Sequence, residues 1–265
     1  MDTTRPPIAL TVAGSDSGGG AGIQADLRTF HAFGVHGTTV ITAITAQNTH
    51  GVRAVHAIPL EHVRAQIDAL MEDLRPAALK TGMLATRELV SAVAVALGEH
   101  DLRRYVMDPV MVATSGDRLL DADAEASLVR ELLPRAEIVT PNLREAAILT
   151  GSAVTTLEEM RIAARRLVDH GARAALVKGG HLEGDAVDLL WDGAEERVWR
   201  RPRIETRHTH GTGCTLSAAI TAGLARGDAT PEAVERAVAF VARAIAHAPG
   251  LGGGHGPVNH FVPVG

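Results

Sequence analysis

The chain has 265 residues, 46% hydrophobic and 22% charged, which is enough for one large α/β domain with a full core. A net charge of −5 and an aromatic content of 3% argue against a nucleic-acid partner, which would require clustered cations and stacking rings. The one cysteine cannot form an internal disulfide, and this fits a reducing compartment. The first apolar run, 8–13, is too short for a signal sequence or a membrane span, so we expect a cytoplasmic protein with no membrane partner.

Strand-length apolar runs alternate with amphipathic helical segments along the whole chain. The predicted strands are 8–13, 38–45, 77–80, 105–107, 138–140, 174–178 and 187–191, and segment 198–206 is either an edge strand or part of a small flap. The predicted helices are 22–33, 60–74, 86–98, 122–133, 144–149, 156–170, 214–226 and 231–248, with Thr230 as the cap of the last. This alternation predicts one domain spanning 1–265, with a mostly parallel sheet covered by helices on both faces.

Polar and glycine-rich residues follow most of the predicted strands. They are the run 14–22, Gln47 with Asn48, the run 80–83, Asp108, Asn142 with Glu145, and Lys178 with two glycines. In open α/β sheets, ligands bind at the carboxyl edge of the strands. We therefore expect a ligand site at this edge.

Lysine is rare in this chain. Of the 26 basic residues, only Lys80 and Lys178 are lysines, and each ends a predicted strand. Lysine is a compact charge that can reach a phosphate. The glycines after Lys178 favour such a role, whereas for Lys80 a functional role and an ordinary surface charge are equally open.

Cys214 lies where a glycine-rich turn enters a predicted helix. Glycines Gly211 and Gly213 let the backbone approach a ligand, and the first N–H groups of a helix attract anions. A thiol at a helix N-terminus has its thiolate form favoured, so we expect a lowered pKa for Cys214. The alternative is a small buried residue that only packs at the turn.

The remaining motifs are less specific. The glycine run 14–22 matches neither a dinucleotide fingerprint nor a P-loop. The spacing of Asn142 and Glu145 fits a capping box better than a metal site. Asp108 before a proline is either a Mg²⁺ ligand or a turn residue. The histidines match no zinc pattern, and we interpret them as solvated or turn residues; they are His208, His210, His255 and His260.

A set of short segments along the chain, taken together, resembles a known family. The segments are 13–26, 45–49, 80–83, 108–110, 141–142 with Glu145, 178–181, 210–214 and 254–260, in this order. Together they are similar to the bifunctional hydroxymethylpyrimidine and phosphomethylpyrimidine kinases of thiamine biosynthesis, in the ribokinase-like superfamily. The resemblance implies a three-layer αβα sandwich, ATP and Mg²⁺, a small-molecule pyrimidine substrate and a homodimer. It also implies two successive phosphorylations, of 4-amino-5-hydroxymethyl-2-methylpyrimidine and then of its monophosphate.

The resemblance further implies roles for individual residues. Cys214 would take the place of the general base, with an anion hole formed around Gly211 and Gly213 and with Lys178 on the ATP phosphate. The other implied roles are pyrimidine binding by Gln47, Asp26, Gly14, Met83 and Val110, phosphate binding by Asn142, Thr212 and His210, and metal binding by Asp108 and Glu145.

Two alternatives stay open. A pyridoxine or pyridoxal kinase of the same superfamily acts on a similar flat ring with a hydroxymethyl group, and Gln47 with Met83 favours the pyrimidine without deciding the matter. A non-catalytic pyrimidine-binding module would not need Asn142, Glu145 and Lys178 together.

Overall fold

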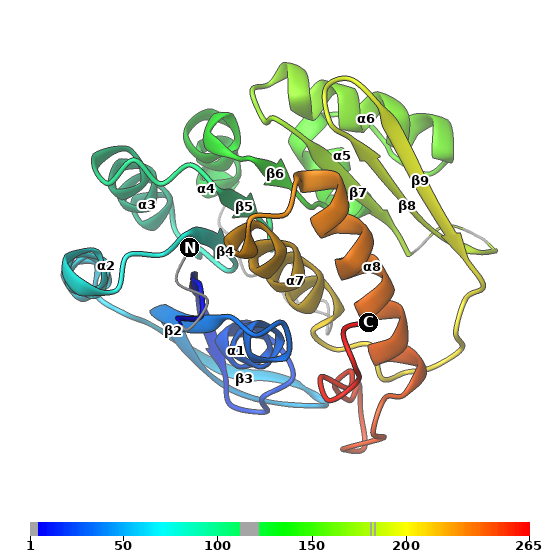
Figure 1. The fold of residues 1–265 in the computed structure, drawn as a ribbon, viewed down its shortest axis with the longest axis horizontal. Helices are drawn as coiled ribbons and strands as arrows, with labels where there is room; N and C mark the ends of the chain where they lie inside the picture. Colours follow the sequence, from blue (N-terminus) through cyan, green and yellow to red (C-terminus); the bar gives the residue numbers. More distant parts are fainter. Residues whose placement is uncertain (1–4, 112–121, 181, 183) are drawn as a thin grey trace.

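The computed structural model describes residues 5–111, 122–180, 182 and 184–265. Within them, one sheet takes the strands in the order β3-β2-β1-β4-β5-β6-β7-β8-β9 (Figure 1). The strands are β1 (Ile8–Asp16), β2 (His36–Asn48), β3 (Gly51–Ala57), β4 (Ala78–Thr81), β5 (Tyr105–Met107), β6 (Ile138–Val139), β7 (Ala175–Gly179), β8 (Ala186–Trp191) and β9 (Glu196–Arg201). His181, part of the motif after Lys178, lies outside the described residues.

The middle of the sheet is parallel and its edges are antiparallel. Parallel pairs join β2 to β1, β1 to β4, β4 to β5, β5 to β6 and β6 to β7. Strand β3 pairs antiparallel with β2, and β8 and β9 form an antiparallel extension beyond β7. The central strands are buried on both faces, which is why they read as continuous apolar runs in the sequence.

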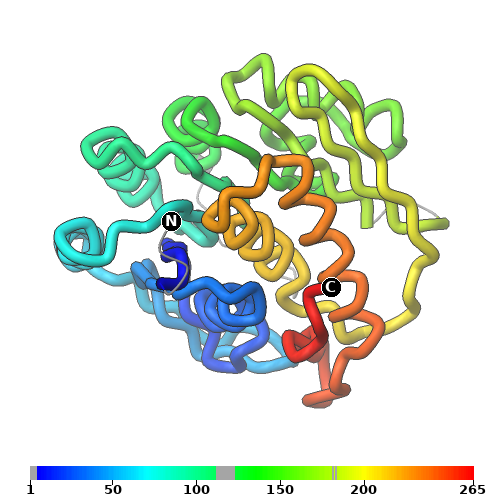
Figure 2. The backbone as a smooth tube through the Cα atoms, in the orientation of Figure 1, coloured from blue at the N-terminus to red at the C-terminus, as the bar shows by residue number. Residues whose placement is uncertain are grey.

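Helices cover both faces of the sheet, which gives the expected three-layer αβα sandwich. The helices are α1 (Gly22–Ala32), α2 (Leu60–Asp73), α3 (Arg87–Glu99), α4 (Ala122–Ser127), α5 (Leu143–Thr150), α6 (Leu157–Asp169), α7 (Thr212–Arg226) and α8 (Thr230–Ala246). Helices α1, α7 and α8 share one apolar cluster, and α2 to α6 supply most of the other. After α8, the chain returns beside α1 (Figure 2).

The structure differs from the sequence-based prediction in a few elements. Strand β3 was not predicted, because its residues are mostly exposed and carry little apolar signal. The helix predicted over 122–133 is α4 followed by a π-helical turn (Leu128–Leu132) and a 3₁₀ turn (Leu133–Arg135). Pro134 in that last turn lacks a backbone N–H and cannot continue an α-helix. Segment 198–206 contributes the edge strand β9, and the cap of α8 is Ala229, not Thr230.

The single sheet extends from residue 8 to residue 201, as one domain requires, although the domain count itself stays a prediction. Among the described residues, we find no helix with the length and apolar character needed to cross a bilayer.

Candidate active site

The carboxyl ends of the parallel strands bring the predicted polar residues to one edge of the sheet. Asp16 is the last residue of β1, and Lys178 is the last but one of β7. Gln47 lies near the end of β2, and Asp108 follows β5 directly. Asn142 follows β6, where it forms an isolated parallel bridge with Lys178. The expected clustering at this edge is therefore present.

The turn before α7 packs closely against the glycine-rich run after β1. Gly211 has a φ of +81°, and a Cβ there would lie 1.8 Å from the carbonyl oxygen of Gly20, so only glycine fits. A Cβ on Gly213 would lie 3.3 Å from Nζ of Lys178. The first turn of α7 therefore presents its backbone beside a lysine ammonium, an arrangement that suits a bound anion.

Lys178 joins two carboxylates at the same place. Its Nζ lies 3.3 Å from Oδ1 of Asp108 and 4.0 Å from Oε2 of Glu145. Burial alone would raise the pKa of Asp108, but Lys178 and Lys80 hold it below its ordinary value. Burial, reinforced by the charge of Asp108, raises the pKa of Glu145 to about 7 despite Lys178.

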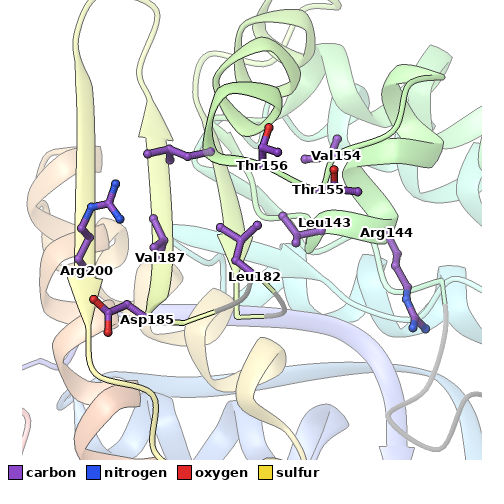
Figure 3. A pocket seen from close by; sticks show the side chains of 10 residues that line it. Leu143, Arg144, Val154, Thr155, Thr156, Leu182, Asp185, Val187 and Arg200 are labelled. Atoms are coloured by element: carbon purple, nitrogen blue, oxygen red, sulfur yellow. The ribbon is translucent and has the colours of Figure 1, made fainter.

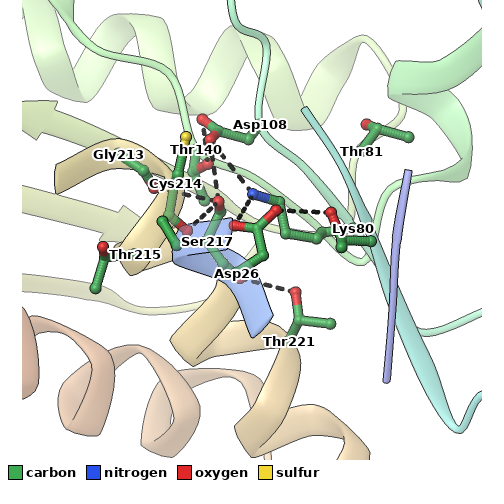
Figure 4. A network of polar contacts seen from close by, with 12 residues as sticks. Asp26, Lys80, Thr81, Asp108, Thr140, Gly213, Cys214, Thr215, Ser217 and Thr221 are labelled. Atoms are coloured by element: carbon green, nitrogen blue, oxygen red, sulfur yellow. Dashed lines mark hydrogen bonds and ion pairs between the residues drawn. The ribbon is translucent and has the colours of Figure 1, made fainter. Parts of the chain in front are cut away.

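A buried ion pair lies beneath this cluster (Figure 4). Lys80 and Asp26 are both 0% exposed, and Nζ of Lys80 donates to Oδ1 of Asp26 at 2.9 Å. The hydroxyl of Thr11 donates to the other oxygen of Asp26 at 2.6 Å. Nζ of Lys80 also lies 4.0 Å from Oδ2 of Asp108. Burial alone would lower the pKa of Lys80, yet the surrounding acidic groups raise it and keep the ammonium charged.

This pair decides one open alternative and corrects one expectation. Lys80 is not a surface charge, because it is a fully buried counter-ion. Asp26, expected on the pyrimidine, instead has both carboxylate oxygens engaged inside the protein and no exposed surface. Sequence reasoning could not pair them, since they lie 54 residues apart on α1 and β4.

Cys214 lies above the buried pair (Figure 4), and its thiol is less acidic than expected. Burial, with the negative charges of Asp26 and Asp108, raises the pKa of Cys214 to about 11, although Lys80 and the backbone N–H of Gly22 act in the other direction. The expected lowering of this pKa is therefore wrong, because loss of solvation and the two carboxylates outweigh Lys80 and the N–H of Gly22.

A cavity of about 700 Å³ opens beside the cluster. Leu143 and Arg144, which follow Asn142 on α5, line one side of it, and Val187 and Arg200 of β8 and β9 line the other (Figure 3). Arg144 directly precedes Glu145 in the sequence, so the cavity adjoins the cluster of Lys178 and Glu145.

Comparison with known proteins identifies the family. The model of the family described as phosphomethylpyrimidine kinase matches residues 16–259. The chain belongs to this family. A Rhizobium meliloti relative named hydroxymethylpyrimidine/phosphomethylpyrimidine kinase is 57% identical over 96% of this chain and 97% of its own.

Solved structures of kinases are also similar to this chain in sequence and in fold. The ADP complex of Bacillus subtilis pyridoxal kinase is 38% identical, with a TM-score of 0.91 over 97% of this chain and 98% of that one. The phosphomethylpyrimidine kinase of Clostridium difficile is 41% identical, with a TM-score of 0.81 over 90% and 99%. The protein is therefore a phosphotransferase with a ribokinase-like fold, and this kinase family uses ATP. These findings go against a non-catalytic binding module.

The capping box of α5 in this kinase is present as its spacing predicted. Oδ1 of Asn142 accepts from the N–H of Glu145 at 3.0 Å, and Oε2 of Glu145 accepts from the N–H of Asn142 at 2.8 Å. The carboxylates of Glu145 and Asp108 are hard oxygen donors close to Lys178. Mg²⁺ in kinases is commonly held by one or two carboxylates together with substrate phosphates, so this donor set fits the ion.

The residues expected on the acceptor lie between β1, β2 and the segments after β4 and β5. A Cβ on Gly14 would lie 2.6 Å from Cε of Met83, so the methionine packs directly on the glycine backbone. Val110 and Gln47 are both half-buried. Tight packing of a flexible thioether on bare backbone provides an apolar wall suited to a flat ring.

Two residues expected on phosphate have other partners in this kinase. The hydroxyl of Thr212 donates to the carbonyl of Thr209 at 2.6 Å, closing the turn before α7. Nε2 of His210 faces Asp16 at 2.9 Å and Gln47 at 3.3 Å, not the first turn of α7. His260 is not solvated, because it is 6% exposed and bonded to Thr215 at 2.9 Å.

Proposed function

We propose that this kinase transfers the terminal phosphoryl group of ATP to 4-amino-5-hydroxymethyl-2-methylpyrimidine and then to the resulting monophosphate, a step of thiamine biosynthesis. The observation that carries the proposal is the convergence of Lys178, Asp108 and the first turn of α7 at the same edge of the sheet as the wall formed by Gly14 and Met83. Relatives named for this activity support the substrate.

Phosphoryl transfer needs alignment and charge neutralisation more than covalent chemistry from the protein. The backbone around Gly211 and Gly213 would neutralise the transferred group, and Lys178 would contact the ATP phosphates. Asn142 and Thr212 would border the phosphates. The nucleoside would occupy the cavity beside Leu143.

Mg²⁺ would be held by Asp108 and Glu145, directly or through water, and it would supply positive charge to the phosphates. Oε2 of Glu145 accepts from the N–H of Asn142, and the carboxylate also accepts from the backbone of Met111, so Glu145 would reach the ion with its remaining lone pairs.

Gln47, Gly14, Met83 and Val110 would hold the pyrimidine. Cys214 would face the acceptor hydroxyl, and with a pKa near 11 it would be a thiol, not a thiolate, before reaction. A dissociative transition state makes a strong base unnecessary, so we assign the larger contribution to the backbone N–H groups. Replacement of Cys214 by alanine should lower kcat more than it raises KM for the pyrimidine, and an unchanged kcat would show that the thiol only packs.

A pyridoxal kinase activity is the second candidate, because a pyridoxal kinase is 38% identical and superposes closely. The test is steady-state turnover of Mg-ATP with three acceptors: the hydroxymethylpyrimidine, its monophosphate and pyridoxal. A higher kcat/KM for pyridoxal would reverse the assignment. The homodimer and the cytoplasmic location are part of the proposal, and sedimentation equilibrium tests the former.

A further inference from the structure

A hydrogen-bond network connects the glycine-rich run, the end of β2 and the turn before α7. Its centre is Asp16, whose carboxylate accepts from the N–H groups of Gly18, Gly20 and Ala21 at 2.8, 3.0 and 2.9 Å. Its side chain is 4% exposed. The remaining partner is Nε2 of His210, 2.9 Å from Oδ2 of Asp16 and 194 residues away in the sequence.

The contact with Asp16 determines where the proton of His210 lies. An ionised carboxylate only accepts hydrogen bonds, so Nε2 of His210 must carry a proton and donate it to Asp16. This holds for the neutral tautomer and for the charged imidazolium alike. The same nitrogen therefore cannot accept a bond from Gln47.

The side-chain amide of Gln47 lies between His210 and Thr45. Its Nε2 is 3.3 Å from Nε2 of His210, and its Oε1 is 3.2 Å from the hydroxyl of Thr45. That hydroxyl already donates its one proton to the carbonyl of Ser15 at 2.9 Å. With the amide in this orientation, the N–H groups of Gln47 and His210 face each other on one side. On the other side, neither Oε1 of Gln47 nor the Thr45 hydroxyl has a proton left to donate.

Rotation of the Gln47 amide by 180° removes both conflicts. The oxygen then faces the Nε2–H of His210, whose one proton is shared between Asp16 at 2.9 Å and Gln47 at 3.3 Å as a three-centre hydrogen bond, and the nitrogen donates to the Thr45 hydroxyl. One N–H of Gln47 and one oxygen lone pair stay free for a ligand. Their order is fixed, with the acceptor on the His210 side and the donor on the Thr45 side.

We propose that His210 is a specificity-determining positioning residue, which fixes the orientation of the Gln47 amide and so selects an acceptor with an amino group over one with a carbonyl. This rests on the proposed function, in which Gln47 contacts the ring. Beside the hydroxymethyl-bearing carbon, the pyrimidine carries an amino group, which donates to the amide oxygen. Pyridoxal carries an aldehyde at that position, whose oxygen would meet the amide oxygen and be repelled.

The packing around His210 explains why a ring occupies this position. A Cβ on Gly20 would lie 2.5 Å from Cδ2 of His210, so the ring packs directly against the backbone of Gly20. The N–H of His210 donates to Gly256 and its carbonyl accepts from Val258, which anchors the backbone to the C-terminal segment. The ring is thus held by Gly20 and Asp16 before any ligand binds.

The test compares the ratio of kcat/KM for the hydroxymethylpyrimidine to that for pyridoxal. His210→Leu removes the donor, and we expect the ratio to fall about tenfold, through a higher KM for the pyrimidine, with KM for ATP unchanged. His210→Gln keeps an N–H donor at a similar reach and should restore most of the ratio. His36→Leu, an exposed histidine at the amino end of β2, is the matched control and should leave it unchanged.

Thr45→Val removes the partner on the other side of the Gln47 amide and should lower the same ratio, so the test stands even if His210→Leu does not fold. An unchanged ratio in the folded variants would overturn the inference, as would a raised KM for ATP alone, which would return His210 to the phosphate. A wild-type enzyme that does not phosphorylate the pyrimidine would instead overturn the proposed function.

Discussion

The buried pair of Lys80 and Asp26 provides the sharpest test of how this site is supported. We consider Lys80→Met, which keeps the length of the side chain and removes its charge. Asp26 is 0% exposed, and it would retain only the hydroxyl of Thr11 as a partner. The negative charges of Asp26 and Asp108 would then face each other without the ammonium between them.

Removing one partner of a buried ion pair costs about 3–5 kcal/mol, because the other charge stays buried and unpaired. The 2.9 Å contact and the complete burial of both groups place Lys80→Met within this range. For a chain of this size, each kcal/mol lowers Tm by about 2–4 °C, so we expect a decrease of roughly 6–20 °C. Asp26→Asn in the same background removes the unpaired charge and keeps an acceptor for Thr11. The double variant should therefore be more stable than the sum of the single effects by about 2 kcal/mol or more.

The assay is urea unfolding followed by far-UV circular dichroism, with free energies from linear extrapolation. Arg64 and Asp68, an exposed pair on α2 whose atoms lie 2.8 Å apart, provide a matched control cycle. Exposed pairs contribute about 0–1 kcal/mol, so the coupling in the Arg64→Gln and Asp68→Asn cycle should be small.

Two results would refute the reasoning. One is a free energy of unfolding for Lys80→Met within about 1 kcal/mol of the wild type. The other is a coupling energy between Lys80 and Asp26 no larger than that of the surface pair, since burial is what separates the two cases.

Three further predictions concern single residues. The alkylation rate of Cys214 by iodoacetamide should rise with pH towards a midpoint near the pKa of about 11, so that at pH 8 the thiolate fraction is about 100-fold below that of an ordinary thiol; a midpoint below 9 would contradict the burial argument. Lys178→Ala should raise KM for ATP about tenfold with little change in KM for the acceptor, whereas an unchanged KM with a lower kcat would restrict its contact to the transition state. Burial, together with the charge of Arg28, lowers the pKa of His260 from 6.5 to about 4. The stability contributed by burying the neutral ring is therefore complete above pH 6.5, and it is lost as the pH falls towards 4 because the unfolded chain takes up a proton there first. Urea unfolding of wild type and His260→Gln at pH 7.5 and 5 should show about 2 kcal/mol more acid destabilisation in the wild type, and equal pH dependence would exclude this role.

Local patterns were sufficient for most of the fold. Within the described residues, apolar runs and amphipathic periods located the strands of the parallel sheet and the α-helices with boundaries shifted by a few residues, except that the segment predicted as one helix over 122–133 divides into α4, a π-helical turn and a 3₁₀ turn. Strand β3 was missed because its side chains are largely exposed, so burial leaves no periodic signal in its sequence. The capping box of Asn142 and Glu145 was predictable because both partners lie within one helical turn.

Local reasoning was less successful at the site. It predicted that the polar residues gather at the carboxyl edge of the sheet, since parallel strands bring their ends together. It did not predict which side chains contact each other there. The solvated interpretation of the histidines was wrong for His260, whose partner Thr215 lies 45 residues away. Nothing near His210 in the sequence indicates Asp16.

The sequence by itself determined the fold class, the ligand-binding edge of the sheet, the position of Lys178 at that edge and the glycine-rich turn that contains Gly211. These follow from the order of strands and from residues whose conformational needs are local, such as a glycine at φ +81°. Only the tertiary structure decided that Asp26 neutralises Lys80, that His210 faces Asp16, and that the thiol of Cys214 is weakly acidic. Each of these depends on desolvation and on charges brought together from distant segments, and neither quantity is encoded in the spacing of residues along the chain.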